Sequence, residues 1–223
     1  MLGNSLLNGQ IGYRFIPKTA CTSIKRYFFQ QEYQIPFEER KKHRNIHVHE
    51  FFTRRETSID GCKVRVIVIR DPIKRFLSAY GNRVVGHNQL SRATLTELHG
   101  ETDPQLIESL PKFNPDLPTF IEHFDIYSKV GDIYHHCHPM TDFLDGNSLQ
   151  YFTHVFTIES LESFPSYFNQ LYGKNLDLPW LQTSGSKHSV TELGSEHINF
   201  LLSYYQADYE LVKDYYTPGQ LLG

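Results

Sequence analysis

A lysine and two hydroxyl side chains lie close together near the N-terminus, at Lys18, Thr22 and Ser23. The largely apolar residues 13–16 before them predict a buried strand, and the pattern after them predicts a helix over 22–33. A short polar loop between a strand and a helix directs backbone N–H groups at one point, where the helix dipole adds partial positive charge. We therefore expect this loop to bind phosphate. It does not match the Walker pattern of kinases and GTPases, because the lysine comes early and no glycine bounds the turn.

A second candidate site follows the β-branched run 63–69, which predicts a strand buried on both faces of a parallel sheet. The run ends at Arg70, and Asp71 with the proline after it predicts a capped helix over 73–83. Arg70 should therefore lie at the carboxyl end of a strand, where open α/β sheets bind ligands. Ser78, eight residues after Arg70, falls in the second turn of that helix.

Two histidines lie between these sites. Residues 45–50 predict a short strand, and alternation along it puts His47 and His49 on one face. Glu50 follows directly, either to orient His49 or as an exposed carboxylate.

Composition indicates a soluble protein that forms one domain over residues 1–223. The net charge of −3 hides an uneven distribution, since residues 1–92 carry a net charge of +10 and residues 93–223 carry −13. The basic half contains the phosphate-binding candidates, which favours an anionic ligand there over accidental clustering. Three widely spaced cysteines, Cys21, Cys62 and Cys137, favour free thiols in a reducing compartment.

The remaining pattern predicts one more strand at 151–157 and helices at 118–127, 160–172 and 195–216. Residues 84–116 are irregular, and we assign this segment to acceptor binding. The expected fold is α/β, with a mainly parallel central sheet flanked by helices.

Three segments together resemble the PAPS-dependent sulfotransferases, and most of all their carbohydrate branch. The first family motif appears as PKTACTSIKR at 17–26, and the second, an R-D-P followed by a helix with a serine, appears as RDPIKRFLSAY at 70–80. NIHVHEFF at 45–52 occupies the position of the family's catalytic histidine. Weaker similarity continues at 136–140, 157–161 and 204–215. The first of these segments, HCHPM, departs from the family pattern, and this departure concerns acceptor recognition.

The resemblance implies a P-loop-nucleotide-kinase-like fold and a donor, 3′-phosphoadenosine-5′-phosphosulfate (PAPS), which becomes adenosine 3′,5′-bisphosphate. It implies that Lys18 neutralises the bridging oxygen and the leaving 5′-phosphate, with help from Thr22, Ser23 and the backbone at Thr19, Ala20 and Cys21. It also implies that Arg70 and Ser78 bind the 3′-phosphate. Alignment, a base and positive charge suffice for this chemistry, so no metal is expected.

For the general base we select His49, because its position matches the family's strand-end histidine and imidazole titrates near neutral pH. His47 is the second choice, and the alternative is that one or both rings are structural. Lys187 lies in a segment that resembles the loop covering the donor in relatives. It contacts phosphate there or is simply exposed.

Three other interpretations stay open. His135, His136, Cys137 and His138 suggest zinc, although their tight clustering suits a tetrahedral site poorly, and His138 is also a candidate for acceptor contact. A kinase-like phosphotransferase would need Mg²⁺ on an acidic side chain, for which Asp71 is the candidate. The third interpretation is a non-catalytic protein that binds a nucleotide or polyanion, and it is motivated by the positive charge of residues 1–92.

We therefore predict an enzyme that transfers a sulfuryl group from PAPS to a hydroxyl of a carbohydrate or glycoconjugate, by in-line displacement with a histidine base. Its partners are the nucleotide donor and the hydroxyl acceptor, with no nucleic acid and no membrane span. We expect a cytoplasmic enzyme of bacterial type, or alternatively an excised luminal catalytic domain.

Overall fold

Strand β4 (Val64–Ile69) organises the sheet, as its run of β-branched residues predicts, and Val66 to Ile69 are fully buried in the computed structural model. The structure describes residues 1–38, 46–97, 103–179 and 188–222. The chain forms two compact units, one of Met1–Arg70 with Phe143–Thr183 and one of Asp71–Asp142 with Ser184–Gly223. Each unit is described by itself. A single domain over residues 1–223 stays a prediction.

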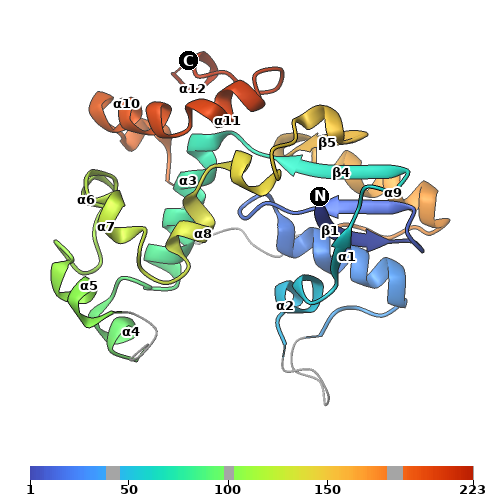
Figure 1. The fold of residues 1–223 in the computed structure, drawn as a ribbon, viewed down its shortest axis with the longest axis horizontal. Coiled ribbons are helices and arrows are strands. Elements are labelled where there is room, and N and C mark those ends of the chain that lie inside the picture. Colours follow the sequence, from blue (N-terminus) through green and yellow to red (C-terminus); the bar gives the residue numbers. More distant parts are fainter. Residues whose placement is uncertain (39–45, 98–102, 180–187, 223) are drawn as a thin grey trace. The chain divides into compact units, whose positions relative to one another are not determined.

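The first unit holds a five-stranded mixed sheet in the order β3-β1-β2-β4-β5 (Figure 1). Its other strands are β1 (Leu2–Leu6), β2 (Ile11–Arg14), β3 (Glu56–Ser58) and β5 (His154–Thr157). β2 and β5 run parallel to β4, whereas β1 pairs antiparallel with both β2 and β3. The expectation of a mainly parallel sheet is therefore wrong for its N-terminal half, where β1 and β2 form a hairpin.

The turn of that hairpin explains the error. Leu7, Asn8 and Gly9 all adopt positive φ, and an Asn-Gly pair between two apolar segments is the usual sequence signal for a tight hairpin turn. The signal lies in the N-terminal residues that the sequence pattern left unassigned.

Helices α1 (Cys21–Tyr33), α2 (Val48–Thr53) and α9 (Ser163–Tyr172) belong to the same unit, with 3₁₀ turns at Leu149–Tyr151 and Ile158–Ser160. Aromatic side chains join α1 and α9 to one face of the sheet, where the ring of Phe28 lies 5.0 Å from that of Phe168 and 5.5 Å from that of Tyr13. Tyr27 also donates a hydrogen bond of 2.9 Å to Asn169 of α9. Burial of these rings fixes α1 above β2 and β4.

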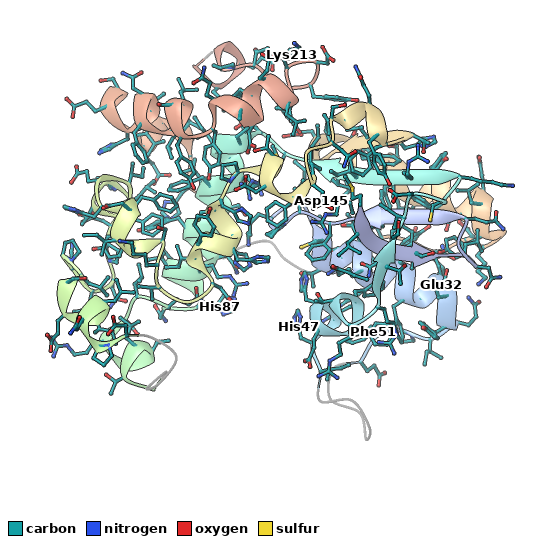
Figure 2. All side chains as sticks on the ribbon, viewed as in Figure 1. Glu32, His47, Phe51, His87, Asp145 and Lys213 are labelled. Carbon is teal, nitrogen blue, oxygen red and sulfur yellow. The ribbon has the colours of Figure 1, made fainter. Side chains whose placement is uncertain are left out.

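The strand expected over residues 45–50 is wrong for residues 46–50. The described part of this segment starts α2, and Asn45 lies outside the described residues. Val48, Phe51 and Phe52 are buried at helical spacing, and the side chain of His47 caps the helix by accepting from the N–H of His49 at 3.2 Å. His47 lies at the start of α2 and Phe51 one turn further along (Figure 2). The alternation that suggested a strand is therefore a cap followed by the first turn of a helix.

The second unit is helical. Its helices are α3 (Pro72–Tyr80), α4 (Arg92–Glu97), α5 (Pro104–Ser109), α6 (Leu117–Glu122), α7 (Phe124–Tyr127), α8 (Ile133–Cys137), α10 (Ser195–Tyr204), α11 (Gln206–Leu211) and α12 (Gly219–Leu222). A π-helix (Gly81–Gly86) follows α3, and 3₁₀ turns occupy Met140–Phe143, at the boundary between the units, and Val190–Glu192.

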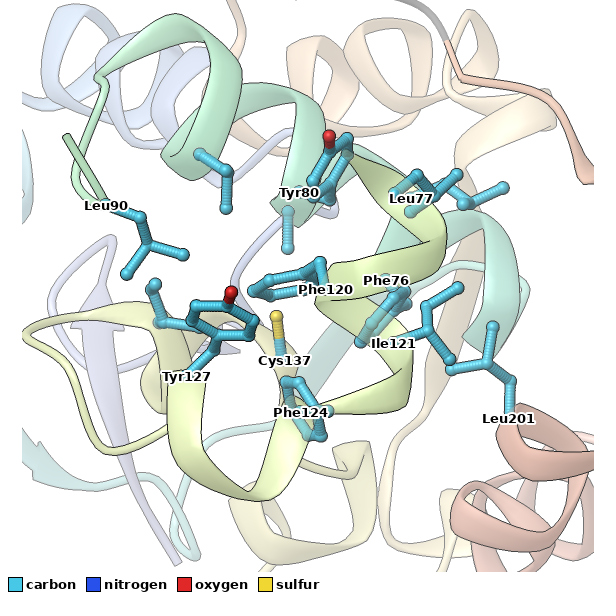
Figure 3. Close-up of a cluster of buried hydrophobic side chains, with 14 of the residues drawn as sticks. Phe76, Leu77, Tyr80, Leu90, Phe120, Ile121, Phe124, Tyr127, Cys137 and Leu201 are labelled. Atoms are coloured by element: carbon cyan, nitrogen blue, oxygen red, sulfur yellow. The ribbon is translucent and has the colours of Figure 1, made fainter. Parts of the chain in front are cut away.

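The core of this unit gathers aromatic side chains from α3, α6 and α7 (Figure 3). Phe76 of α3 is completely buried, with ring centroids 5.6 Å from Phe120 and 5.3 Å from Phe124. Three expected helices are shorter than predicted: 73–83 changes to π-helical geometry at Gly81, 118–127 breaks at His123 and 195–216 breaks at Tyr205. Their apolar stripes are nevertheless buried, as predicted. Within the described residues, no helix has the length and hydrophobicity needed to cross a lipid bilayer.

Gly12 of the central strand β2 tests how tightly the sheet of the first unit packs against Ile59. A Cβ added at Gly12 would lie 2.6 Å from the Cβ of buried Ile59, whereas one at Gly61 would meet nothing within 4 Å. We expect Gly12→Ala to lower the free energy of unfolding by about 1–3 kcal/mol through overpacking, and Gly61→Ala to change it by less than about 0.5 kcal/mol. Chemical denaturation of both variants measures this. Equal stability of the two would contradict the close approach.

Candidate functional site

The carboxyl ends of β2, β4 and β5 lie at the same edge of the sheet, because these strands are parallel. Past this edge come the loop carrying Lys18, the residue Arg70 and the turn Ile158–Ser160. This is the edge where open α/β sheets bind ligands. The guanidinium of Arg70 donates a hydrogen bond of 3.2 Å to the carbonyl oxygen of Lys18. The structure therefore brings the side chain of Arg70 to the backbone of the loop that carries Lys18.

The loop between β2 and α1 has an unusual backbone. Lys18 and Ala20 both adopt left-handed conformations, with φ of 70° and 60°, although neither is glycine. Between them Thr19 is fully buried, and its hydroxyl donates to the carbonyl of Ile16 at 2.8 Å. Non-glycine residues in this region store strain and cluster at ligand-binding sites. The hydroxyl of Thr19 therefore makes a structural hydrogen bond, and the expected contact of its backbone with the donor stays a prediction.

The N-terminus of α1 supplies the rest of an anion site. Ala20 is the N-cap residue, and its methyl group cannot accept a hydrogen bond from the first turn, in contrast to the usual Ser, Thr or Asp. The 13-residue helix therefore points its positive end at the loop, with Thr22 half-buried and Ser23 buried in its first turn. Burial raises the pKa of the Cys21 thiol, an effect that Lys25 and Lys18 only partly offset, so Cys21 is a thiol at neutral pH.

His49 lies against this helix terminus, in the first turn of α2. Its Nε2 is 2.9 Å from the hydroxyl of Thr22 and 3.9 Å from the sulfur of Cys21. Its ring meets the edge of the Phe15 ring at 6.2 Å and stacks on the ring of His47 at 5.0 Å. The structure thus places the predicted base beside the predicted phosphate loop. His47 is exposed and serves as the N-cap of α2.

Lys25 is a residue of this site that sequence reasoning did not select. It is completely buried on α1, with Nζ 3.3 Å from Nδ1 of His49 and 3.3 Å from the centre of the Phe15 ring. Burial lowers its pKa from 10.5 to about 8, and Arg14 also lowers it, whereas Cys21 and Glu56 raise it. The available signal was spacing, because Lys25 follows Cys21 by four residues and Thr22 by three and so shares their helix face.

Two further predicted donor-binding residues are not part of the described first unit. Ser78 is half-buried on α3 of the second unit, and Lys187 lies outside the described residues. Their contacts with the donor stay predictions.

In the second unit Asp71 caps α3, as predicted. One carboxylate oxygen of Asp71 accepts from the N–H of Lys74 at 2.9 Å, and the other accepts from the hydroxyl of Tyr209 at 3.2 Å. These bonds occupy both carboxylate oxygens, which argues against the Mg²⁺ ligand that a kinase would need.

The histidine-rich segment of the second unit is held by backbone contacts. The guanidinium of buried Arg75 donates to the carbonyls of His136, Cys137 and His138, and buried Asp208 accepts from the N–H groups of Met140 and Thr141. His136 contacts the Asp132 carbonyl and Arg83, and His138 contacts Asp142 at 3.0 Å. Among the described residues, no group of three or more His, Cys, Asp or Glu side chains is arranged to hold a metal ion. Acceptor contact by His138 stays a prediction.

Comparison with known proteins identifies a matching family. A family model described as "Sulfotransferase family" matches residues 8–215, which includes every residue of the loop, α1 and α2. No curated protein and no solved structure matches the chain.

The lowered pKa of Lys25 predicts a pH-dependent stability. Between its folded pKa of about 8 and its unfolded value of 10.5, the unfolded chain binds the extra proton, so stability rises with pH. Relative to Lys25→Met, the wild-type free energy of unfolding should rise by roughly 2–3 kcal/mol from pH 7 to pH 10. Guanidinium denaturation at both pH values checks this. A constant difference between the two proteins would show that Lys25 titrates normally.

Proposed function

Because the chain belongs to the sulfotransferase family, whose enzymes use PAPS, we propose that it transfers a sulfuryl group from PAPS to a hydroxyl of a carbohydrate or glycoconjugate. The observation that carries the proposal is the contact of 2.9 Å between His49 Nε2 and Thr22 at the N-terminus of α1. It puts a base next to the helix terminus suited to a phosphate. The carbohydrate acceptor rests on the resemblance of residues 17–26 to the carbohydrate branch.

The groups at the sheet edge fit the nucleotide donor chemically. Lys18, Arg70 and the positive end of α1 are all suited to phosphate oxygens, and a guanidinium binds phosphate with paired, charge-assisted hydrogen bonds. When bound, PAPS supplies a sulfuryl group that its phosphate–sulfate anhydride has already activated. The protein must therefore align the acceptor, remove its proton and stabilise charge on the leaving phosphate.

Each of these tasks falls to a residue at the site. Lys18 neutralises the bridging oxygen and the 5′-phosphate, assisted by backbone N–H groups of the first turn of α1. Arg70 binds the 3′-phosphate. His49 accepts the proton of the acceptor hydroxyl, and the ring of Phe15 packs against its imidazole.

The asparagine variants of the two histidines separate the base from the cap. His49→Asn should lower kcat for sulfuryl transfer by about 10²–10⁴-fold, the usual contribution of general base catalysis. His47→Asn should keep kcat within a few-fold, because asparagine also caps helices well. Transfer of ³⁵S from labelled PAPS to a panel of monosaccharide and glycosaminoglycan acceptors measures both. If His47→Asn lost activity while His49→Asn kept it, the two roles would be reversed.

Nucleotide binding tests the donor site independently of the acceptor. We expect adenosine 3′,5′-bisphosphate to raise the melting temperature more than ATP, GTP or NAD, because only this ligand places phosphates for both Lys18 and Arg70. Lys18→Met should abolish most of that shift, whereas Lys213→Met, the same change at an exposed side chain, should leave it intact. Stronger stabilisation by Mg-ATP than by the bisphosphate would count against the proposal and favour a phosphotransferase.

A further inference from the structure

Both ring nitrogens of His49 are engaged by residues of α1. Nδ1 lies 3.3 Å from Nζ of Lys25, and Nε2 lies 2.9 Å from the hydroxyl of Thr22. A neutral imidazole carries one proton, so the partner at Nδ1 decides which nitrogen has the free electron pair. The contact with Lys25 therefore controls where His49 can act as a base.

The two protonation states of Lys25 have opposite consequences. An ammonium group only donates, so Nδ1 must accept from it, the ring proton then resides on Nε2, and Nε2 is no base. A neutral amine accepts from Nδ1–H, which leaves the electron pair of Nε2 available on the side of Thr22 and the phosphate loop.

We propose that Lys25 is a positioning residue for sulfuryl transfer, whose neutral amine accepts the Nδ1 proton of His49 and thereby makes Nε2 the catalytic base. The inference rests on the proposed function, in which His49 is that base. Nε2 then takes the proton of the acceptor hydroxyl, and Nδ1–H of the resulting imidazolium stays bonded to Nζ. The hydroxyl oxygen bonds to sulfur while the bond from sulfur to the bridging oxygen breaks, with its electron pair left on that oxygen.

The surroundings of Lys25 favour the neutral form of its amine. The side chain is completely buried on α1, and burial is the main cause that lowers its pKa to about 8. Arg14 of β2 acts in the same direction. The opposing groups are Glu56 of β3 and Cys21 of α1, together with the faces of the Phe15 and Phe52 rings, which favour the ammonium. Among the described residues, His47 of α2 is a further titratable neighbour, because its ring stacks on that of His49.

Burial also separates this role from donor binding. A side chain with no exposed surface is not available to the nucleotide, so its loss should act on kcat and leave KM for PAPS unchanged. Methionine has a similar unbranched shape and removes the amine. Glutamine retains an acceptor, its amide oxygen, which does not titrate.

The first test is the pH dependence of kcat/KM with PAPS and the best acceptor of the panel. The wild-type profile should rise with an inflection near pH 8, and in Lys25→Met the inflection should move toward about 6.5, the ordinary histidine value. At pH 6.5, the kcat/KM of the variant, expressed as a fraction of its own high-pH plateau, should then be roughly 15-fold larger than the same fraction for the wild type. Its plateau kcat should fall roughly tenfold, the usual effect of losing one hydrogen bond.

Two further variants complete this series. The pH profile of Lys25→Gln should have the same shifted inflection as that of Lys25→Met, and its plateau kcat should be closer to that of the wild type. Lys63→Met, the same change at an exposed position before β4, should leave the profile unchanged. An inflection that is identical in the wild type and Lys25→Met would overturn the inference while leaving the proposed function intact.

The second test needs no turnover. Long-range ¹H–¹⁵N spectra distinguish the two imidazole tautomers, and the signals of His49 among the 12 histidines are assigned by their absence from His49→Gln. We expect the Nε2–H form at pH 7 and the Nδ1–H form at pH 9 in the wild type, with no such exchange in Lys25→Met. One tautomer at both pH values in the wild type would also overturn the inference. Failure of wild type to transfer sulfuryl groups to any acceptor, with tautomer exchange present, would instead reject the proposed function.

Discussion

The parallel pairing of β2 with β4 is the constraint on which the site depends. The register that aligns Tyr13 with Val66 and Arg14 with Ile67 makes both strands run toward the same edge of the sheet. The chain after β2 must then turn sharply into α1, and the residue after β4 falls beside that turn. The hydrogen bond from Arg70 to the carbonyl of Lys18 is the direct result. Burial of the aromatic side chains between α1, α9 and the sheet keeps this register, since a slip of one residue would expose them.

Several features of the site are destabilising, and the packing of the sheet and its helices offsets them. Left-handed conformations at Lys18 and Ala20 and a fully buried amine at Lys25 are each unfavourable alone. They persist because close packing of buried neighbours, among them Ile16 after β2 and Ile24 on α1, restricts other arrangements. Strain and a buried titratable group beside one helix terminus are expected where a protein favours a reaction over maximal stability.

The sequence predicted the parts of the structure whose signals are local. The run 63–69 became β4, the cap at Asp71 was confirmed and α1 began within one residue of its predicted start. The wrong assignments came from competing interpretations of short segments: residues 46–50 alternate as a strand would, yet Val48, Phe51 and Phe52 also match a helix, and burial decided the outcome. Lys25 was missed because a lysine in a helix is usually exposed, and only the tertiary fold shows His49 against it.

We propose that one nucleotide is held at the N-terminus of α1 within reach of His49, and a crystal structure with adenosine 3′,5′-bisphosphate would test this. We expect the 5′-phosphate within hydrogen-bond distance of Lys18 and the first-turn N–H groups of α1, the 3′-phosphate on Arg70, and His49 facing the position of the transferred group. A nucleotide bound away from this loop, or with His49 directed away from the 5′-phosphate, would contradict it.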